Sequence, residues 1–171
     1  SRGRGEARED SDIDVVCVLD GLQTEDLRAY RRTLSEMPDG ALACGFVCGL
    51  SQLAVWPAYD LLALMLDVKP VKGDLEKLVP LPGRKAAREA VRFGAANLYH
   101  GTCHAYLYGA DSPESLRELY KGAFFLLRMA WYLETGTWPP TGRTLSMVLE
   151  AAGQAEALEV LATHLAWDSP A

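Results

Sequence analysis

The chain lacks any long hydrophobic run. No stretch of its 171 residues approaches the roughly 18 consecutive apolar residues that a membrane-spanning helix needs. The pattern of a signal peptide, with a basic start, an apolar centre and a small-residue cleavage site, is not present either. Membrane insertion and secretion are therefore not indicated, and we expect a cytoplasmic protein.

Positive charge is also scarce. Lys and Arg number 17 against 23 Asp and Glu, which gives a formal net charge of −6. A general nucleic-acid surface needs a basic stripe, and the one dense cationic stretch is a short loop that contains Arg2, Arg4 and Arg8. We therefore expect no general nucleic-acid binding. The hydrophobic share of 49% and the charged share of 23% fit a globular protein of one or two domains.

Cysteines are few, and none is spaced as Cys-x-x-Cys. Cys17, Cys44, Cys48 and Cys103 all lie in apolar segments, so a zinc or redox site of that type is not indicated. We expect reduced, buried thiols. Cys44 and Cys48 are four residues apart in an expected strand, which is too far for a disulfide.

What the chain does have is a pair of acids at the start of an apolar strand. Asp12 and Asp14 flank Ile13, and the apolar run continues to Leu19. Residues two apart in a strand point to the same face, so we expect both carboxylates on one side. Two charges that open a buried strand need a counter-charge, and Mg²⁺ prefers oxygen ligands. The pattern predicts a magnesium site at Asp12 and Asp14.

A basic loop with two glycines precedes the acids. Gly3 and Gly5 let backbone N–H groups approach an anion, and the side chains of Ser1, Arg2 and Arg4 can donate hydrogen bonds to phosphate oxygens. Loop and acids together predict a site for a metal ion and a nucleoside triphosphate. The alternative is a polar surface turn in front of an ordinary strand.

The remaining chain indicates a first part with strands and a second part made of helices. An amphipathic helix capped by Thr24 is expected after the first strand, and a second buried strand over residues 41–49. The Pro- and Gly-rich segment 70–83 marks a domain boundary. Four helices with short connections then predict an antiparallel bundle; we expect them over residues 84–108, 112–134, 144–152 and 155–166. The fold class is therefore α+β, with domains over residues 1–72 and 83–171.

The motif at the start of the chain resembles the signature of the nucleotidyltransferase superfamily that includes DNA polymerase β. That signature reads Gly-Ser, a spacer of roughly ten residues, and then Asp, a hydrophobic residue and Asp. Here Ser1, residues 2–11 and the sequence Asp12-Ile13-Asp14 stand in its place. The resemblance implies that the preceding Gly, its strand and a helix are missing, so that the N-terminal part of the domain is absent.

The same resemblance implies a fold and a set of ligands. The expected fold is a minimal nucleotidyltransferase mixed sheet with flanking helices. We expect Asp12 and Asp14 to hold Mg²⁺, and Ser1, Arg2 and Ser11 to bind a nucleoside triphosphate, with ATP expected.

The two-domain layout resembles the kanamycin nucleotidyltransferase group of antibiotic-modifying enzymes and related proteins with HEPN-type helical bundles. The Trp56-Pro57 break and residues 73–77 ahead of the first bundle helix belong to that likeness. In that group the first bundle helix presents a carboxylate base to the substrate hydroxyl, and His104 stands at about that position. The resemblance thus implies His104 as the base, a role that imidazole can fill near neutral pH.

A third acid is harder to identify. The family adds a third metal-holding carboxylate from a neighbouring strand, and the matching position here is near Cys44. A thiol is a poor ligand for magnesium. Asp39 and Asp67 are the nearest acids in sequence, so either one of them reaches in, or the site binds a single ion, or activity has been lost.

Histidines lie on one side of the expected helix 84–108. Asn97, His100 and His104 share a narrow sector at 100° per residue, and the opposite, packing face is expected to contain Val91, Ala95, Leu98, Thr102 and Ala105. Three interpretations remain open: a catalytic role for His104, a solvated polar face, and a zinc site that includes Cys103.

The function expected from these features is transfer of a nucleoside monophosphate to a hydroxyl acceptor. The acceptor is a small molecule, such as an aminoglycoside-like antibiotic, or a protein. The alternative is a weakly active or inactive partner protein, like the nucleotidyltransferase antitoxins that neutralise HEPN toxins. The apolar segment 123–133, broken only by Arg128, must be covered on several sides, and a homodimer is expected to add to that cover.

Overall fold

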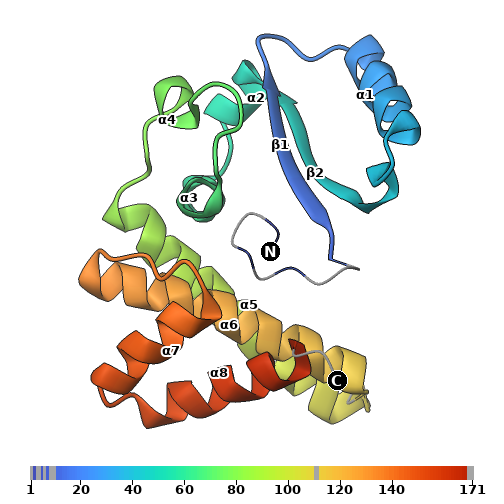
Figure 1. The fold of residues 1–171 in the computed structure, drawn as a ribbon. Helices are drawn as coiled ribbons and strands as arrows, with labels where there is room; N and C mark the ends of the chain where they lie inside the picture. Colours follow the sequence, from blue (N-terminus) through green and yellow to red (C-terminus); the bar gives the residue numbers. More distant parts are fainter. Residues whose placement is uncertain (1, 3–4, 6, 8–10, 110–111, 169–171) are drawn as a thin grey trace. The chain divides into compact units, whose positions relative to one another are not determined.

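The computed structural model describes residues 2, 5, 7, 11–109 and 112–168, and within them the protein is mixed α and β with helices in the majority (Figure 1). The expected α+β class is confirmed. The elements in chain order are β1 (Ile13–Leu19), α1 (Thr24–Glu36), β2 (Ala43–Gly49), α2 (Leu50–Ala54), α3 (Ala58–Asp67), α4 (Leu75–Leu78), α5 (Arg84–Tyr108), α6 (Pro113–Thr135), α7 (Gly142–Ala151) and α8 (Ala155–Asp168). No described helix is both long and apolar enough to cross a bilayer.

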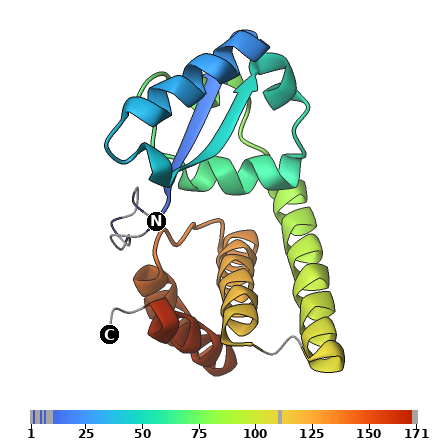
Figure 2. The same cartoon turned by 90° about the vertical axis from the view of Figure 1, so that its right-hand side faces the viewer.

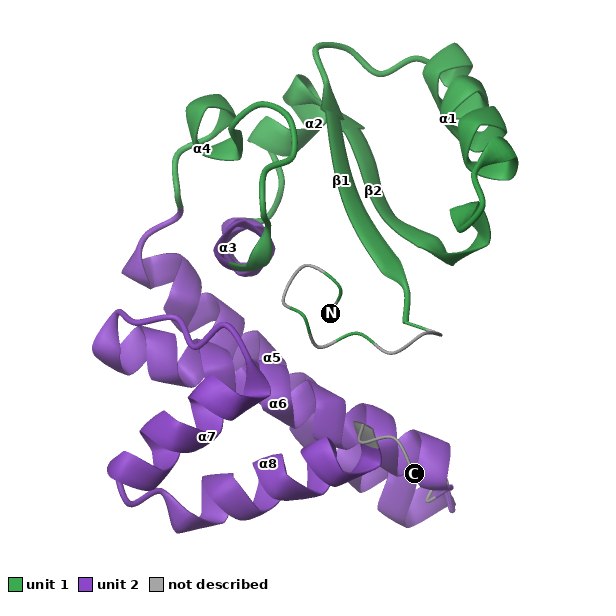
Figure 3. Ribbon diagram, viewed as in Figure 1, with its two compact units in different colours: residues 1–57, 67–81 green, residues 58–66, 82–171 purple. Residues whose placement is uncertain are grey.

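The chain divides into two compact units (Figure 3). One comprises residues 1–57 and 67–81, and the other comprises residues 58–66 and 82–171. Most of α3 therefore packs with the helices that follow the Pro- and Gly-rich segment, although it precedes that segment in sequence. The contact is apolar: Leu62 of α3 shares a buried cluster with Ala86 and Ala87 of α5 and Met129 of α6.

The first unit is built on a pair of parallel strands. β1 and β2 pair from Ile13 opposite Ala43 to Leu19 opposite Gly49. Parallel strands need a crossover connection, and α1 provides it together with a short 3-10 helix (Gly40–Leu42). Both strands lie where the apolar runs predict them. Within the described residues the sheet consists of this parallel pair alone, and no antiparallel strand makes it a mixed sheet.

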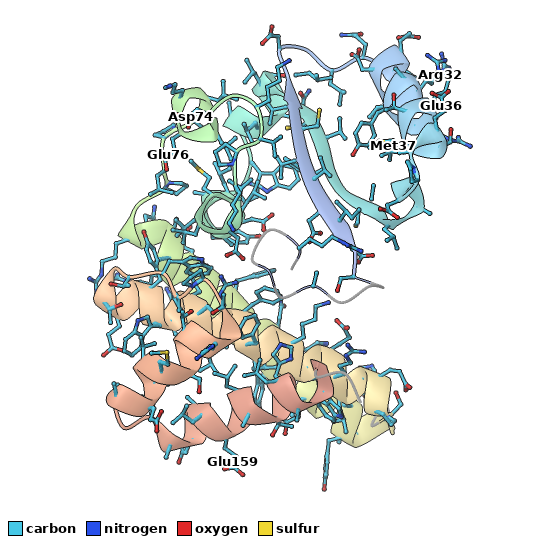
Figure 4. All side chains as sticks on the ribbon, in the orientation of Figure 1. Arg32, Glu36, Met37, Asp74, Glu76 and Glu159 are labelled. Atoms are coloured by element: carbon cyan, nitrogen blue, oxygen red, sulfur yellow. The ribbon has the colours of Figure 1, made fainter. Side chains whose placement is uncertain are left out.

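At the start of two helices in this unit, a carboxylate accepts a hydrogen bond from the backbone. The expectation that Thr24 caps α1 is wrong, because Gln23 is the N-cap residue and its backbone N–H donates to Asp26 Oδ2 at 2.8 Å. At the start of α4, Asp74 Oδ1 accepts the N–H of Glu76 at 3.1 Å (Figure 4). Acids suit these positions because they satisfy free N–H groups and oppose the positive end of the helix dipole.

The second unit contains α5 to α8, close to the four expected ranges. α5 is the longest described helix (Figure 2). The start of α6 agrees with the expected range: Ser112 Oγ accepts the N–H of Ser115 at 3.2 Å, and Pro113 is the first helical residue. α6 packs against α5 and α8, and α7 packs against α8. A buried cluster joins α6, α7 and α8, formed by Phe124, Leu145, Leu149 and Leu161.

The packing face of α5 agrees with the expected one in part. Val91 and Leu98 are partly buried and Ala105 is buried, whereas Ala95 and Thr102 are exposed. Two glycines also face α6. A Cβ added to Gly94 would lie 3.3 Å from Leu126 Cδ1, and one added to Gly101 would lie 2.9 Å from Leu119 Cδ2. These leucines therefore occupy the space that the glycines leave open. A hydrophobic pattern does not count glycine as a contact residue, which is why the sequence misses this part of the face.

Arg128 is buried inside the apolar part of α6. Its side chain is 0% exposed. Nε donates to the carbonyl oxygen of Pro139 at 2.9 Å, and a terminal nitrogen donates to that of Pro140 at 3.2 Å. The guanidinium also stacks on Trp138, 4.1 Å from the ring centre. The one charge in the apolar segment therefore secures the chain between α6 and α7, rather than interrupting the core.

Candidate functional site

The two acids of the motif lie at the start of β1. Asp14 is the second residue of the strand, Asp12 comes directly before it, and both are exposed while Ile13 between them is partly buried. Asp12 lies outside the strand, so the expectation that both carboxylates leave the same face of β1 stays a prediction. The expectation of two buried charges is wrong, because water reaches both of them in this two-stranded sheet. Both side chains are exposed to solvent, so no burial penalty forces an ion to bind.

Cys44 occupies the neighbouring position on β2. It is paired in register with Asp14 and is exposed, so a thiol stands beside the acids where a third carboxylate was sought. Asp39 is exposed just before the 3-10 helix, and Asp67 is the last residue of α3. In the described part of the chain no three His, Cys, Asp or Glu side chains gather as a metal cluster. The candidate site therefore consists of two carboxylates.

Two hydrogen bonds join described residues ahead of the acids. Arg2 Nε donates to the backbone carbonyl of Ser11 at 3.0 Å, and the N–H of Gly5 donates to the carbonyl of Arg2 at 3.2 Å. Gly5 has φ +76°, a left-handed conformation that favours glycine. Arg2 and Ser11, two of the three expected nucleotide-binding residues, are thus brought together next to Asp12. Ser1 lies outside the described residues, as do Gly3, Arg4 and Arg8.

His104, the expected base, lies on α5 in the second compact unit. Asn97, His100 and His104 are all exposed, in agreement with the expectation that they face away from the core. The rings of His100 and His104 have their centres 6.2 Å apart, and the ring of Tyr108 lies 4.8 Å from that of His104. This tyrosine, which no motif in the sequence marks, therefore packs beside the candidate base.

The thiols are less buried than expected. All four cysteines are free; Cys44 is exposed, Cys17 and Cys103 are partly buried, and only Cys48 is buried. Burial raises the pKa of the Cys48 thiol, and the neighbouring Cys17 raises it further. Cys48 is therefore an apolar core group, and Cys44 is the accessible thiol beside the acids.

Comparisons with known proteins add no relative. No protein-family model matches the chain, and no significant match was found among curated proteins or among solved structures. The functional argument therefore depends on the residues themselves.

Proposed function

We propose that this protein is a magnesium-dependent nucleotidyltransferase, which transfers a nucleoside monophosphate from a nucleoside triphosphate, with ATP expected, to a hydroxyl acceptor. The observation that carries the proposal is the start of β1, where Asp12 and Asp14 stand exposed beside a loop that Arg2 ties to Ser11. Two carboxylates with an arginine bonded to the residue next to them supply both the negative charge that a metal ion needs and the positive charge that a triphosphate needs.

The proposal includes the arrangement of the fold. The parallel strands β1 and β2 belong to a minimal nucleotidyltransferase sheet, and α5 to α8 form an antiparallel four-helix bundle of the HEPN type. The opposed direction of α5 and α6 supports the bundle, since Gly94 meets Leu126 while Gly101 meets Leu119.

Each proposed residue has a separate role. Asp12 and Asp14 hold the ion and align the α-phosphate, while Ser1, Arg2 and Ser11 steady the remaining phosphates. When bound, Mg²⁺ supplies charge neutralisation at the phosphoryl oxygens. His104 takes the proton of the acceptor hydroxyl. The transfer joins the acceptor oxygen to the α-phosphorus and releases pyrophosphate.

The acceptor is proposed as a class. A small cationic molecule of the aminoglycoside type suits a chain whose net charge is −6, and a protein hydroxyl is the other candidate. We also propose a cytoplasmic homodimer. Exposed apolar side chains on α5, among them Tyr99 at 75% and Leu107 at 67%, supply surface that a second copy could cover.

One observation favours a second candidate function. Cys44 stands opposite Asp14 in the strand register, in the place where the resembling family has a third carboxylate, and a thiol binds magnesium poorly. A weakly active or inactive antitoxin-like binding protein is therefore the alternative.

One assay separates the two candidates. The protein is incubated with α-labelled ATP, Mg²⁺ and a panel of aminoglycosides and proteins, and label on the acceptor is measured. Acceptor-dependent, EDTA-sensitive labelling supports the enzyme. Magnesium-dependent ATP binding without any labelled product supports the binding protein, and the loss of both would falsify the nucleotide site itself.

A further inference from the structure

Two of the three histidines of the chain lie one helical turn apart on the exposed side of α5. His100 and His104 are separated by four residues, and their ring centres lie 6.2 Å apart. Residues i and i+4 of a helix are surface neighbours. The third histidine, His164, is 4% exposed in the core of the second unit and stacks on Phe124. The chain thus presents one accessible histidine pair.

The two imidazoles are available as ligands. Both are exposed, and neither makes a hydrogen bond or an ion pair within the described part of the chain. α5 contains no acidic residue after Glu89. Among the described residues, no third His, Cys, Asp or Glu joins the two histidines in a group that could hold a metal ion. The pair therefore offers two nitrogen donors, a set that suits late transition metals rather than Mg²⁺ or Ca²⁺.

The pair is close to the geometry of a chelate. With each nitrogen about 2 Å from a metal ion, two imidazoles bound at a tetrahedral angle have ring centres about 5 Å apart. The observed 6.2 Å is within about 1 Å of that value, a difference that rotation of two exposed side chains can close. The ring of Tyr108, packed 4.8 Å from that of His104, limits the positions that His104 takes.

We propose that His100 and His104 form a two-imidazole site for a divalent late transition metal ion, with water in its remaining coordination positions. Cu²⁺ is expected to bind most tightly, with Ni²⁺ and Zn²⁺ weaker. Cys103 is not a ligand: it is partly buried, and on a helical wheel it lies 60° or more from either histidine. The site thus differs from a zinc site that includes Cys103.

The metal site has a consequence for the proposed transfer reaction, and this consequence rests on the proposed function. An ion bound to His104 occupies the lone pair that the base needs to accept a proton. Ni²⁺ should then inhibit transfer by the wild-type protein. The His100→Ala variant keeps His104 but loses the chelate, so it should need much more Ni²⁺ for the same inhibition.

The test is a binding titration with the untagged full chain. Cu²⁺ is followed by electron paramagnetic resonance and Ni²⁺ by calorimetry, with wild type and the His100→Ala and His104→Ala variants compared. Wild type is expected to bind one ion with two nitrogen donors in the spectrum. Each variant should bind roughly a hundredfold more weakly, because the second donor no longer acts at high effective concentration.

Two control variants keep the test specific. The double variant His104→Ala/Leu107→His retains three histidines but separates the exposed pair by seven residues, and it should lose the tight site. Cys103→Ser should bind as wild type does. Unchanged affinity in His104→Ala, or loss of binding in Cys103→Ser, would overturn the proposal. Asp14→Asn should retain the ion, so a failure of the nucleotide site and a failure of this site are distinguishable.

Discussion

The guanidinium of Arg128 lies 4.1 Å from the centre of the Trp138 ring, ten residues further along the chain. The same group donates to the carbonyl oxygens of Pro139 and Pro140. Neither carbonyl lies in a helix or strand, and a fully buried charge needs such acceptors to offset its lost hydration. The arginine and the connection after α6 therefore depend on each other.

Replacing Arg128 by Met should destabilise the second unit. Two backbone acceptors lose a charged donor, which costs about 3 to 5 kcal/mol in total. Arg128→Lys keeps the charge but not the planar guanidinium, so its free energy of unfolding should lie between those of wild type and Arg128→Met. Urea denaturation measures the free energy of unfolding. Arg92→Met, at an exposed site on α5, serves as the control and should change it by less than about 0.5 kcal/mol.

A methyl group at Gly45 should disrupt the strand pair. Gly45 has φ +151°, and an added Cβ would overlap the carbonyl oxygen of Val15 on β1. We expect Gly45→Ala to cost at least about 2 kcal/mol, since backbone strain and a steric clash act together. Thermal unfolding followed by circular dichroism measures the loss.

The matched control is Gly122→Ala on α6. Gly122 is exposed, and an added Cβ would meet nothing within 4 Å. Because alanine is the better helix former, this variant should gain up to about 1 kcal/mol. Equal effects at the two glycines would show that the clash with Val15 is absent.

The cysteines should react in a fixed order with iodoacetamide. Cys44 is exposed, whereas Cys48 is buried and has a raised pKa. A raised pKa leaves less thiolate at a given pH, and the thiolate is the nucleophile. At pH 8 we expect Cys44 to be alkylated first and Cys48 last, as measured by peptide mass spectrometry. Denaturant should abolish the difference, and early labelling of Cys48 in the native protein would contradict its burial.

Charge removal at the start of β1 should stop the proposed transfer. Asp14→Asn and Asp12→Asn each remove one anionic ligand and should lower the rate to background, while His104→Ala should slow the reaction without abolishing it. The rate of labelled product formation at saturating ATP and Mg²⁺ is the measurement. Asp20→Asn, an exposed acid just past the other end of β1, is the matched control and should keep the wild-type rate.

Local signals predicted the elements well. Ser112, Pro113 and Glu114 are typical of a helix start and lie at the start of α6. The apolar runs before Leu19 and after Gly40 coincide with the two strands. Such signals act within a few residues, so a single sequence contains them in full. The helical character of residues 58–67 was not predicted, because a short apolar run lacks a distinguishing period.

Features that depend on distant neighbours were predicted less well. Both acids and Cys44 are exposed because the number of strands, and not the apolarity of one strand, decides how much of a sheet is covered. The contact role of Gly94 and Gly101 depends on Leu126 and Leu119, which lie 32 and 18 residues further along the chain. The role of His104 as the base for the reaction at Asp12 and Asp14 depends on parts of the chain that are distant in sequence, and it stays a prediction.

The glycines of α5 also limit how this helix can move. Gly94 and Gly101 are seven residues, or two turns, apart on α5, and Leu126 and Leu119 have the same spacing on α6. Each leucine therefore packs in the space above one glycine. If α6 moved by one turn along α5, each of these leucines would meet a larger side chain in place of a glycine. These contacts therefore oppose sliding of α5 along α6. They also hold His100 and His104 at a constant position along the axis of α6.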